Sequence, residues 1–366
     1  MSGIHVLVVD DSALVRQAFT QLLSRNFTVD TAADPIIAER KMARQRPSVI
    51  VLDLQMPRVD GMTFLRQIMR RDPIPVVICS AAAARGSEIA MRALEEGAVD
   101  VMLKPSIGVR DFIAESAVML IDTITAAAQA RVGKKPSMPV TERYSADVVI
   151  AARQAGELAL RTTSSQLVVA VGASTGGTEA LRAMIEALPP DAPGMVIVQH
   201  MPEGFTAAFA KRLNETARVE VKEAAYGDGV IPGRVLIAPG NHHMLLRRSG
   251  NRYYVQVTGG PLVSRHRPSV DVLFRSVAQA AGASAVGVIL TGMGDDGAEG
   301  LLEMREAGAR TIAQDEATSV IFGMPKEAIA RGAAIDVLPL QEIVPLILRS
   351  SRRQPDRDPR PALSSI

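Results

Sequence analysis

Residues 5–23 read HVLVVDDSALVRQAFTQLL. The short β-branched run His5–Val9 is followed by two aspartates and then by a segment of helical length, which is the pattern of a βα unit. The same alternation recurs along the chain in two separate blocks. It predicts parallel sheets covered by helices, and therefore an α/β protein with two domains.

The first block predicts a domain over residues 1–125. Each of its short apolar runs is followed by a helical segment, so we expect a five-stranded parallel sheet. The expected strands are His5–Val9, Thr28–Ala32, Val49–Leu52, Val76–Cys79 and Val99–Leu103.

A linker is expected over residues 126–164. Residues 133–139 read GKKPSMP, and the two prolines exclude a continuous helix or strand there. Further on, Val149, Ala152, Ala155 and Leu158 have helical spacing. The spacing leaves open whether that stretch extends the linker or packs on one of the domains.

The second block, residues 165–348, predicts a doubly wound α/β domain with a mostly parallel sheet. Turn sequences at residues 239–241 (PGN) and 248–251 (RSGN) indicate a local antiparallel hairpin attached to it. Residues 349–366 are rich in arginine and proline and poor in apolar residues, so we expect a disordered tail.

Composition excludes several classes of function. Lysine plus arginine exceed aspartate plus glutamate by 41 − 39 = 2, and only 3% of residues are aromatic, so no nucleic-acid partner is expected. The longest nearly apolar run, 280–294, is shorter than the ~20 residues that span a bilayer. We expect a cytoplasmic protein without direct membrane insertion, and we interpret the single cysteine, Cys79, as a buried core thiol.

Carboxylates follow two strands of the first block. Asp10 and Asp11 come after the first strand and Asp53 after the third. The carboxyl ends of parallel strands converge on one edge, and three carboxylates there would repel one another unless a cation such as Mg²⁺ lay among them. Ser80 and Lys104 follow the fourth and fifth strands and would complete a cradle for a phosphoryl group.

These five residues resemble those of a bacterial response-regulator receiver domain, and the resemblance covers residues 1–125. It implies a flavodoxin-like fold, phosphorylation of Asp53, Mg²⁺ held by the three aspartates, and contacts from Ser80 and Lys104 to the phosphoryl group. Val101 stands where many receivers carry an aromatic residue that moves on activation, so we do not expect an aromatic switch. Helix capping could account for Asp10 or Asp11 singly.

The second block carries a serine in a glycine-rich turn. Residues 172–177 read GASTGG between a predicted strand and a predicted helix, and such a turn can expose the hydroxyl of Ser174. Alone, the pattern is equally consistent with a helix cap by Ser174 or Thr175, or with a phosphate cradle. His200 ends the next strand, where it could act as the general base for the serine.

A third strand-to-helix turn, LTGMGDDG at residues 290–297, could supply the acid. Asp296 would then orient His200 and complete a triad with Ser174, in an order that differs from ordinary α/β-hydrolases.

The same turn fits a dinucleotide-binding alternative, because it matches G-x-G-x-x-G and Asp315 follows near the end of another strand. Asp295 and Asp296 argue against it, since negative charge at a helix N-terminus repels a pyrophosphate.

Five stretches occur in order behind the receiver-like block: GASTGG, VIVQHMP, APGNHHM, SRHRPSVDVLF and LTGMGDDGAEG. Together they resemble the catalytic domain of the bacterial chemotaxis receptor methylesterases. The resemblance implies hydrolysis of glutamate γ-methyl esters, and deamidation of some glutamines, on chemoreceptors. It implies Ser174 as nucleophile, His200 as general base, Asp296 as orienting acid, the backbone N–H of Met293 as oxyanion donor, and Thr175 as an adjacent hydroxyl.

The resemblance also implies partners and cofactors. Methyl-accepting chemoreceptors would be the substrates, a chemotaxis histidine kinase the phosphodonor, and Mg²⁺ would belong to the receiver domain, with no cofactor in the esterase step. His242 and His243 lack metal-ligand spacing, so we expect exposed turn histidines. Residues 265–267 (RHR) could face an acidic receptor surface, pair with Asp271, or form a solvated loop.

Overall fold

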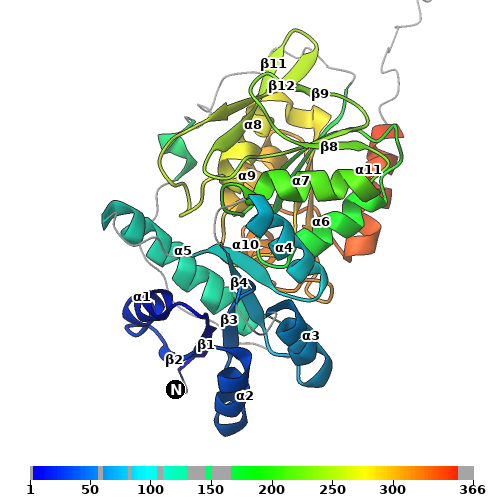
Figure 1. Cartoon of the computed structure of the whole chain (residues 1–366). Helices are drawn as coiled ribbons and strands as arrows, with labels where there is room; N and C mark the ends of the chain where they lie inside the picture. Colours follow the sequence, from blue (N-terminus) through cyan, green and yellow to red (C-terminus); the bar gives the residue numbers. More distant parts are fainter. Residues whose placement is uncertain are drawn as a thin grey trace, which may run out of the picture.

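The computed structural model describes residues 3–56, 61–80, 84–104, 110–130, 145–150 and 166–352. Figure 1 shows two α/β units, the N-terminal one in blue to cyan and the C-terminal one in green to red. The expected α/β class with two largely parallel sheets is confirmed.

The N-terminal unit is a five-stranded parallel sheet in the order β2-β1-β3-β4-β5. The central strands β1 and β3 are buried along their whole length, which explains why they read as continuous apolar runs. Its elements are β1 (His5–Val9), α1 (Ala13–Leu23), β2 (Thr28–Ala32), α2 (Pro35–Arg44), β3 (Val49–Asp53), α3 (Gly61–Arg71), β4 (Val76–Ser80), α4 (Ala84–Glu95), β5 (Asp100–Leu103) and α5 (Arg110–Gln129).

The C-terminal unit contains a seven-stranded parallel sheet in the order β15-β14-β13-β6-β7-β10-β8. The strand order reverses between β6 and β13, which leaves a crevice at the carboxyl ends of these strands. Its elements are β6 (Val168–Ala173), α6 (Gly177–Glu186), β7 (Gly194–Gln199), α7 (Phe205–Thr216), β8 (Glu220–Glu223), β10 (Arg234–Ile237), α8 (Val270–Ala280), η2 (Gly282–Ser284), β13 (Ala285–Ile289), α9 (Ala298–Glu306), β14 (Arg310–Gln314), α10 (Met324–Ala330), β15 (Asp336–Leu338) and α11 (Leu340–Arg352).

The expected hairpin is present as β11 (His243–Ser249) and β12 (Arg252–Thr258), which pair antiparallel. A third strand, β9 (Gly229–Val230), pairs with β12 and extends the hairpin to a three-stranded sheet. With only two residues, β9 is too short to give a periodic signal in the sequence.

Two helices extend past the expected domain ends. Helix α5 continues to Gln129, past residue 125, and α11 continues to Arg352, past residue 348. The rest of the expected tail, residues 353–366, and residues 131–144 of the linker lie outside the described residues.

Residues 146–150, at the start of the stretch whose apolar residues have helical spacing, pack on the C-terminal unit. They include the 3-10 turn η1 (Ala146–Val148), whose Ala146 is buried together with Ile150 against Leu245 and Val263. The carboxylate of Asp147 accepts a hydrogen bond from the buried guanidinium of Arg275. Residues 151–161 of the same stretch are not described.

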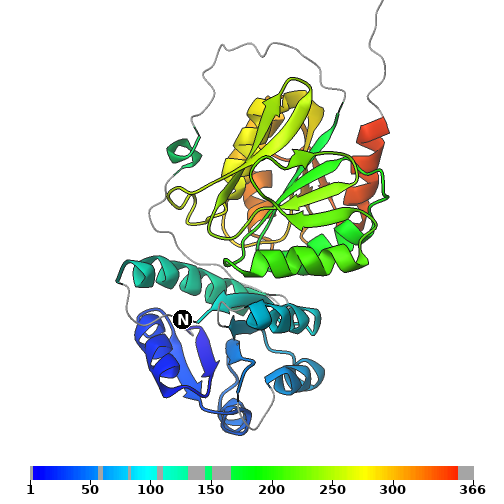
Figure 2. The same cartoon turned by 45° about the horizontal axis from the view of Figure 1, so that its top comes forward.

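The two units are in contact. Helix α4 packs against α6 and α7, and Figure 2 shows the N-terminal unit lying against one end of the C-terminal unit. Ile321 of the C-terminal unit is buried within the hydrophobic cluster of the N-terminal sheet, with Met293 and Val320 packed beside it.

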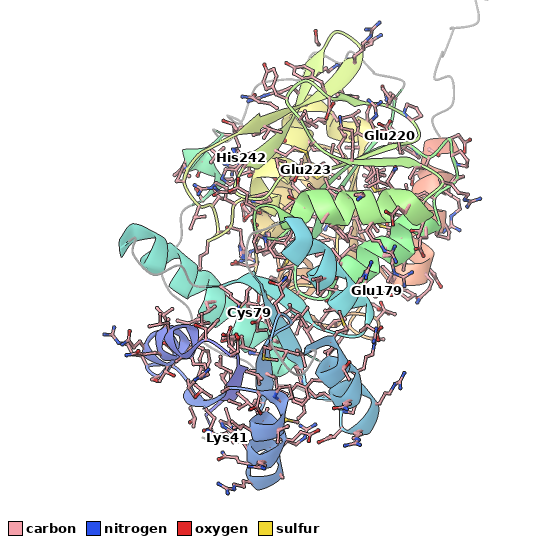
Figure 3. All side chains as sticks on the ribbon, in the orientation of Figure 1. Lys41, Cys79, Glu179, Glu220, Glu223 and His242 are labelled. Atoms are coloured by element: carbon pink, nitrogen blue, oxygen red, sulfur yellow. The ribbon has the colours of Figure 1, made fainter. Side chains whose placement is uncertain are left out.

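Two expectations from composition can be compared with this fold. Cys79 is 1% exposed and lies inside the N-terminal unit (Figure 3), as expected for a core thiol. Among the helices in the described part of the chain, none is long and apolar enough to cross a membrane.

Candidate active site

Ser174 follows β6 directly at the crevice. Its backbone N–H donates to the carbonyl of Thr291, and its carbonyl accepts from Nε2 of Gln199, at 3.0 Å each. The turn needs glycine on both sides: a Cβ at Gly172 would lie 2.2 Å from a methyl group of Val270, and Gly176 has a φ of 78°. These contacts hold the serine in a sharp strand-to-helix turn, as expected.

His200 and Asp296 form a close pair. Nε2 of His200 lies 2.8 Å from Oδ2 of Asp296, and both side chains are almost fully buried. The carboxylate accepts three more hydrogen bonds at the N-terminus of α8, from the hydroxyl of Ser269 and the backbone N–H groups of Val270 and Asp271. Although burial opposes it, the hydrogen bonds from His200 and from the backbone N–H of Asp271 lower the pKa of Asp296 below its usual range.

Asp271 has the opposite character. Burial, together with the charge of Asp296, raises its pKa well above the ordinary value. Its side chain accepts from the backbone N–H of Gly300 at 2.8 Å and from the hydroxyl of Ser264 at 3.1 Å. Asp271 therefore connects α8 to α9, and it does not pair with residues 265–267 in the described contacts.

Ser174 and His200 lie at adjacent strand ends, because Ala173 is paired with Gln199 between β6 and β7 and the N–H of His200 donates to the carbonyl of Ala173. The Nδ1 atom of His200 is buried without a hydrogen-bond partner among the described residues. With Nε2 directed at Asp296, Nδ1 is the ring atom that remains for a further hydrogen bond. Such contacts are often incomplete without substrate.

The turn with Met293 lies against the serine, since a Cβ on the preceding residue, Gly292, would be 2.7 Å from Cβ of Ser174. The hydroxyl of Thr175 donates to Oδ2 of Asp100 in β5 of the other unit, at 2.8 Å. Burial raises the pKa of Asp100 to about 6, even though the hydrogen bonds from Thr175 and from the N–H of Val101 oppose the shift.

Three residues around the triad were not found from the sequence. Gln199 fixes the carbonyl of Ser174, Ser269 holds Asp296, and Asp100 approaches from the N-terminal unit. A serine at the start of a predicted helix is a recognisable cap signal. Nothing in the sequence indicates the contact of Asp100, which joins residues 75 positions apart.

The remaining histidines differ partly from expectation. His243 is the first residue of β11 and is fully buried, with Nε2 2.9 Å from the carbonyl of Pro261, so the expectation of an exposed turn histidine is wrong for this residue. His242 is half-buried in the loop after β10 (Figure 3), with Nδ1 near the carbonyl of Gly240. Neither belongs to the one histidine-containing cluster found among the described residues, which consists of His200, His266 and Asp296.

Residues 265–267 do not form a simple solvated loop. Arg265 forms an ion pair at 2.8 Å with Asp122 on α5 of the N-terminal unit, and Arg267 bonds to Asn241. The ring of His266 is stacked on that of His200. Two of the three side chains therefore contact the other unit or the triad.

The acidic cluster of the N-terminal unit assembles as expected. Asp10, Asp11 and Asp53 each place a carboxylate oxygen within 4.8 Å of the others, and Nζ of Lys104 lies 2.7 Å from Asp53 and 2.9 Å from Asp10. Although partial burial opposes it, these contacts raise the pKa of Lys104, and burial raises that of Asp10. Ser80 ends β4 beside β5. Three hard oxygen donors suit Mg²⁺.

The dinucleotide alternative is not supported. The side chain of Asp315 accepts from the N–H and hydroxyl of Thr318, so it caps its own turn. A Cβ at Gly297 would lie 2.5 Å from a methyl group of Val270, so close packing explains this glycine. Within the fingerprint, the carboxylate of Asp296 accepts from the N–H groups of Val270 and Asp271 and from His200, so it serves contacts inside the protein.

These features define a class of protein: a receiver-type domain joined to a doubly wound domain with a hydrolase-like serine, histidine and aspartate at its switch point. Family comparisons agree, with residues 6–114 matching the response regulator receiver domain and residues 169–347 matching the CheB methylesterase domain. The chain belongs to the family of receiver-containing protein-glutamate methylesterases/protein-glutamine glutaminases, as its resemblance implies.

Relatives match over nearly their whole length. The chain is 60% identical to protein-glutamate methylesterase/protein-glutamine glutaminase 5 of Anaeromyxobacter dehalogenans, covering 95% of this chain and 97% of the relative. It is 57% identical to protein-glutamate methylesterase/protein-glutamine glutaminase 2 of Rhodospirillum rubrum, covering 96% of this chain and 99% of the relative. Among solved structures, the Thermotoga maritima CheB methylesterase catalytic domain is 39% identical with a TM-score of 0.49, covering 50% of this chain and 98% of that one.

Replacement of Ser269 by alanine tests the support of Asp296. We expect a loss of ~1 kcal/mol in the free energy of unfolding, because the cap of α8 is removed. We also expect a fall in kcat on the order of tenfold, because Asp296 loses one of its anchors. Thermal unfolding and methanol release measure the two effects. Asp34→Ala removes the cap of the remote helix α2 and should leave kcat unchanged. An equal fall in kcat in both variants would contradict a role of Ser269 in supporting Asp296.

Proposed function

We propose that this protein hydrolyses glutamate γ-methyl esters on methyl-accepting chemoreceptors and deamidates some of their glutamines, with a Ser174, His200 and Asp296 triad. The observation that carries the proposal is the His200–Asp296 pair at 2.8 Å beside Ser174 at the switch point. The names of the relatives, which are methylesterases and glutaminases, support the same substrate class.

The chemistry follows from the positions of these groups. Asp296 accepts from Nε2–H of His200, and Nδ1 of His200 takes the proton as Oγ of Ser174 attacks the ester carbonyl. Collapse of the tetrahedral intermediate breaks the ester C–O bond, and His200 returns the proton to the departing methanol. Water then attacks the acyl-enzyme by the same route and leaves a free glutamate. With a glutamine substrate, ammonia departs in place of methanol, and neither route needs a cofactor.

The developing oxyanion needs donors on the side of Ser174 away from His200. The turn at residues 292–294 lies close to the serine Cβ, and the backbone N–H of Met293 is our proposed donor. Thr175 is adjacent, and its hydroxyl is bonded to Asp100 while the two units are in contact.

We further propose that the receiver domain closes this site until Asp53 is phosphorylated. Ser174 is only 9% exposed with the units in contact. Asp100 reaches Thr175, Asp122 pairs with Arg265, and Met293 packs on the receiver cluster. A receptor helix cannot reach the serine past these contacts.

A route from Asp53 to the interface runs along one short strand. Lys104 contacts Asp53 and directly follows β5, and β5 begins with Asp100, the partner of Thr175. A phosphoryl group on Asp53 adds nearly two negative charges that Lys104 and Ser80 must rearrange to meet, and Mg²⁺ held by the aspartates would neutralise part of that charge. A tenfold activation requires only about 1.4 kcal/mol of differential affinity between the domains.

Gating can be tested with a small phosphodonor and Mg²⁺. We expect activation of the whole protein, no response in Asp53→Ala, and a high phosphodonor-independent rate in a fragment that starts at Ser145 and so keeps the docked turn η1. Asp122→Ala should raise the resting rate several-fold, because it breaks the ion pair with Arg265. Asp72→Ala, which breaks an ion pair with Arg46 within the receiver, is the matched control. A fragment no faster than the resting protein would contradict inhibition by the receiver.

The proposed partners follow from this scheme. The substrate is the cytoplasmic part of a chemoreceptor, and a chemotaxis histidine kinase supplies the phosphoryl group to Asp53. Both reactions place the protein in the cytoplasm.

A further inference from the structure

His266 is the strongest feature that the proposed triad does not use. Its ring lies parallel to that of His200, with the ring centroids 3.7 Å apart and an angle of 4° between the planes. Its Nδ1 atom is 3.9 Å from Oδ2 of Asp296. His266 thus covers one face of the His200 ring, which carries the proton in the proposed reaction. It also lies close to the carboxylate of Asp296, which bonds to His200.

A special turn holds His266 in this place. Val263 and His266 exchange two backbone hydrogen bonds, and the residues between them, Ser264 and Arg265, have φ values of 49° and 69°. Positive φ at both central positions is the geometry of a type I′ turn, which usually requires glycine, asparagine or aspartate. Here the serine hydroxyl donates to Asp271, and Arg265 pairs with Asp122. Unfavourable backbone held by several side-chain contacts is typical of functional sites.

The proton on His266 is fixed by its hydrogen bond. Nδ1 lies 2.8 Å from the carbonyl oxygen of Ser264, which can only accept, so Nδ1 carries a hydrogen. Burial, reinforced by the neighbouring charge of His200, lowers the pKa of His266 to about 3, against the attraction of Asp296. The titratable and charged groups around it are His200, Asp296 and Arg265. His266 is therefore neutral at the pH at which an esterase works.

His200 needs such a neighbour. Its bond to Asp296 fixes one ring atom, but χ2 of histidine is a broad torsion that does not fix the plane of the ring. Nδ1 reaches the serine proton only in one orientation of that plane. A flat neutral ring at 3.7 Å restricts the rotation, and it adds no positive charge to oppose the imidazolium that forms during the reaction.

We propose that His266 is a positioning residue for the esterase reaction: by stacking on His200, it holds the imidazole plane in line with Ser174 and keeps water off that face. The inference rests on the proposed role of His200 as general base. The proposal gives His266, the central residue of the RHR stretch at 265–267, a role within the active site, where a contact with an acidic receptor surface was one of the expected roles.

The test compares two substitutions in the full-length protein, activated by a small phosphodonor and Mg²⁺, with methanol release from membranes containing a methylated chemoreceptor as the assay. His266→Ala should lower kcat by about 10- to 100-fold with KM nearly unchanged, because the ring of His200 loses its support. His266→Phe keeps a flat neutral ring and should restore most of kcat.

The outcomes separate this inference from the proposed function. His242→Ala is the matched control, since His242 is half-buried on the same unit without contact to the triad. A folded His266→Phe protein as impaired as His266→Ala, or a His266→Ala protein with unchanged kcat, would overturn the inference. If the alanine protein does not fold, the phenylalanine variant decides alone: near-normal kcat supports stacking, and a large loss refutes it. Activity retained in Ser174→Ala or His200→Gln would instead refute the proposed function.

Discussion

Replacing Ser174 by alanine is expected to lower the rate of methanol release by ~10⁴-fold or more, because it removes the hydroxyl on which the proposed acyl-enzyme forms. His200→Gln should have a similar effect, since the serine proton then has no base, and the double variant should be hardly slower than either single one. Steady-state methanol release with a methylated receptor measures all three.

The control for this prediction is another buried serine of the same unit. Ser276 in α8 accepts from the N–H of Leu246 and donates to the carbonyl of Leu273, without touching the triad. Ser276→Ala should lose some stability but keep kcat. If Ser174→Ala retained a tenth of the normal rate, with a normal circular dichroism spectrum, nucleophilic catalysis by this serine would be refuted.

The second large effect concerns two adjacent aspartates. Asp296→Asn should lower kcat by ~10⁴-fold, because an amide cannot accept from His200 and from the N-terminus of α8 while stabilising the imidazolium. Asp295→Asn should change kcat by less than about threefold, since its carboxylate pairs with Arg331 at 3.2 Å and its side chain is only partly buried. Substrate turnover and thermal unfolding of both variants provide the comparison. A severe loss in Asp295→Asn with a mild one in Asp296→Asn would reverse the assignment of the acid.

Much of this arrangement could be predicted because it depends on one rule of parallel sheets. Residues that directly follow neighbouring strands meet at one edge, and this rule placed Asp10 and Asp53 near Lys104. It likewise placed Ser174 beside His200. The central strands were recognisable because both of their faces are buried, as in β3 and β6, which makes them nearly continuous apolar runs.

What sequence could not predict lies between domains or in unusual backbone. The contacts Asp100–Thr175 and Asp122–Arg265 join residues 75 and 143 positions apart, and no local pattern indicates them. The turn that presents His266 has positive φ at Ser264, a residue that gives no signal for a type I′ turn. His243 was misjudged because β11 begins at that residue, directly after the turn sequence.

The docked turn η1 also sets how far the receiver can travel. Because Ala146 and Ile150 are buried on the C-terminal unit, only the fifteen residue steps from Ala130 to Ser145 join them to the receiver, and that length of chain spans at most about 50 Å. Under the proposed gating, a receiver that separates from the C-terminal unit therefore stays at a local concentration of order millimolar relative to its docking face. Re-docking of the receiver is then an intramolecular, first-order step, and its rate does not depend on the concentration of the protein. The resting and active fractions should consequently follow the phosphorylation level of Asp53 alone, and the response should be insensitive to variation in expression.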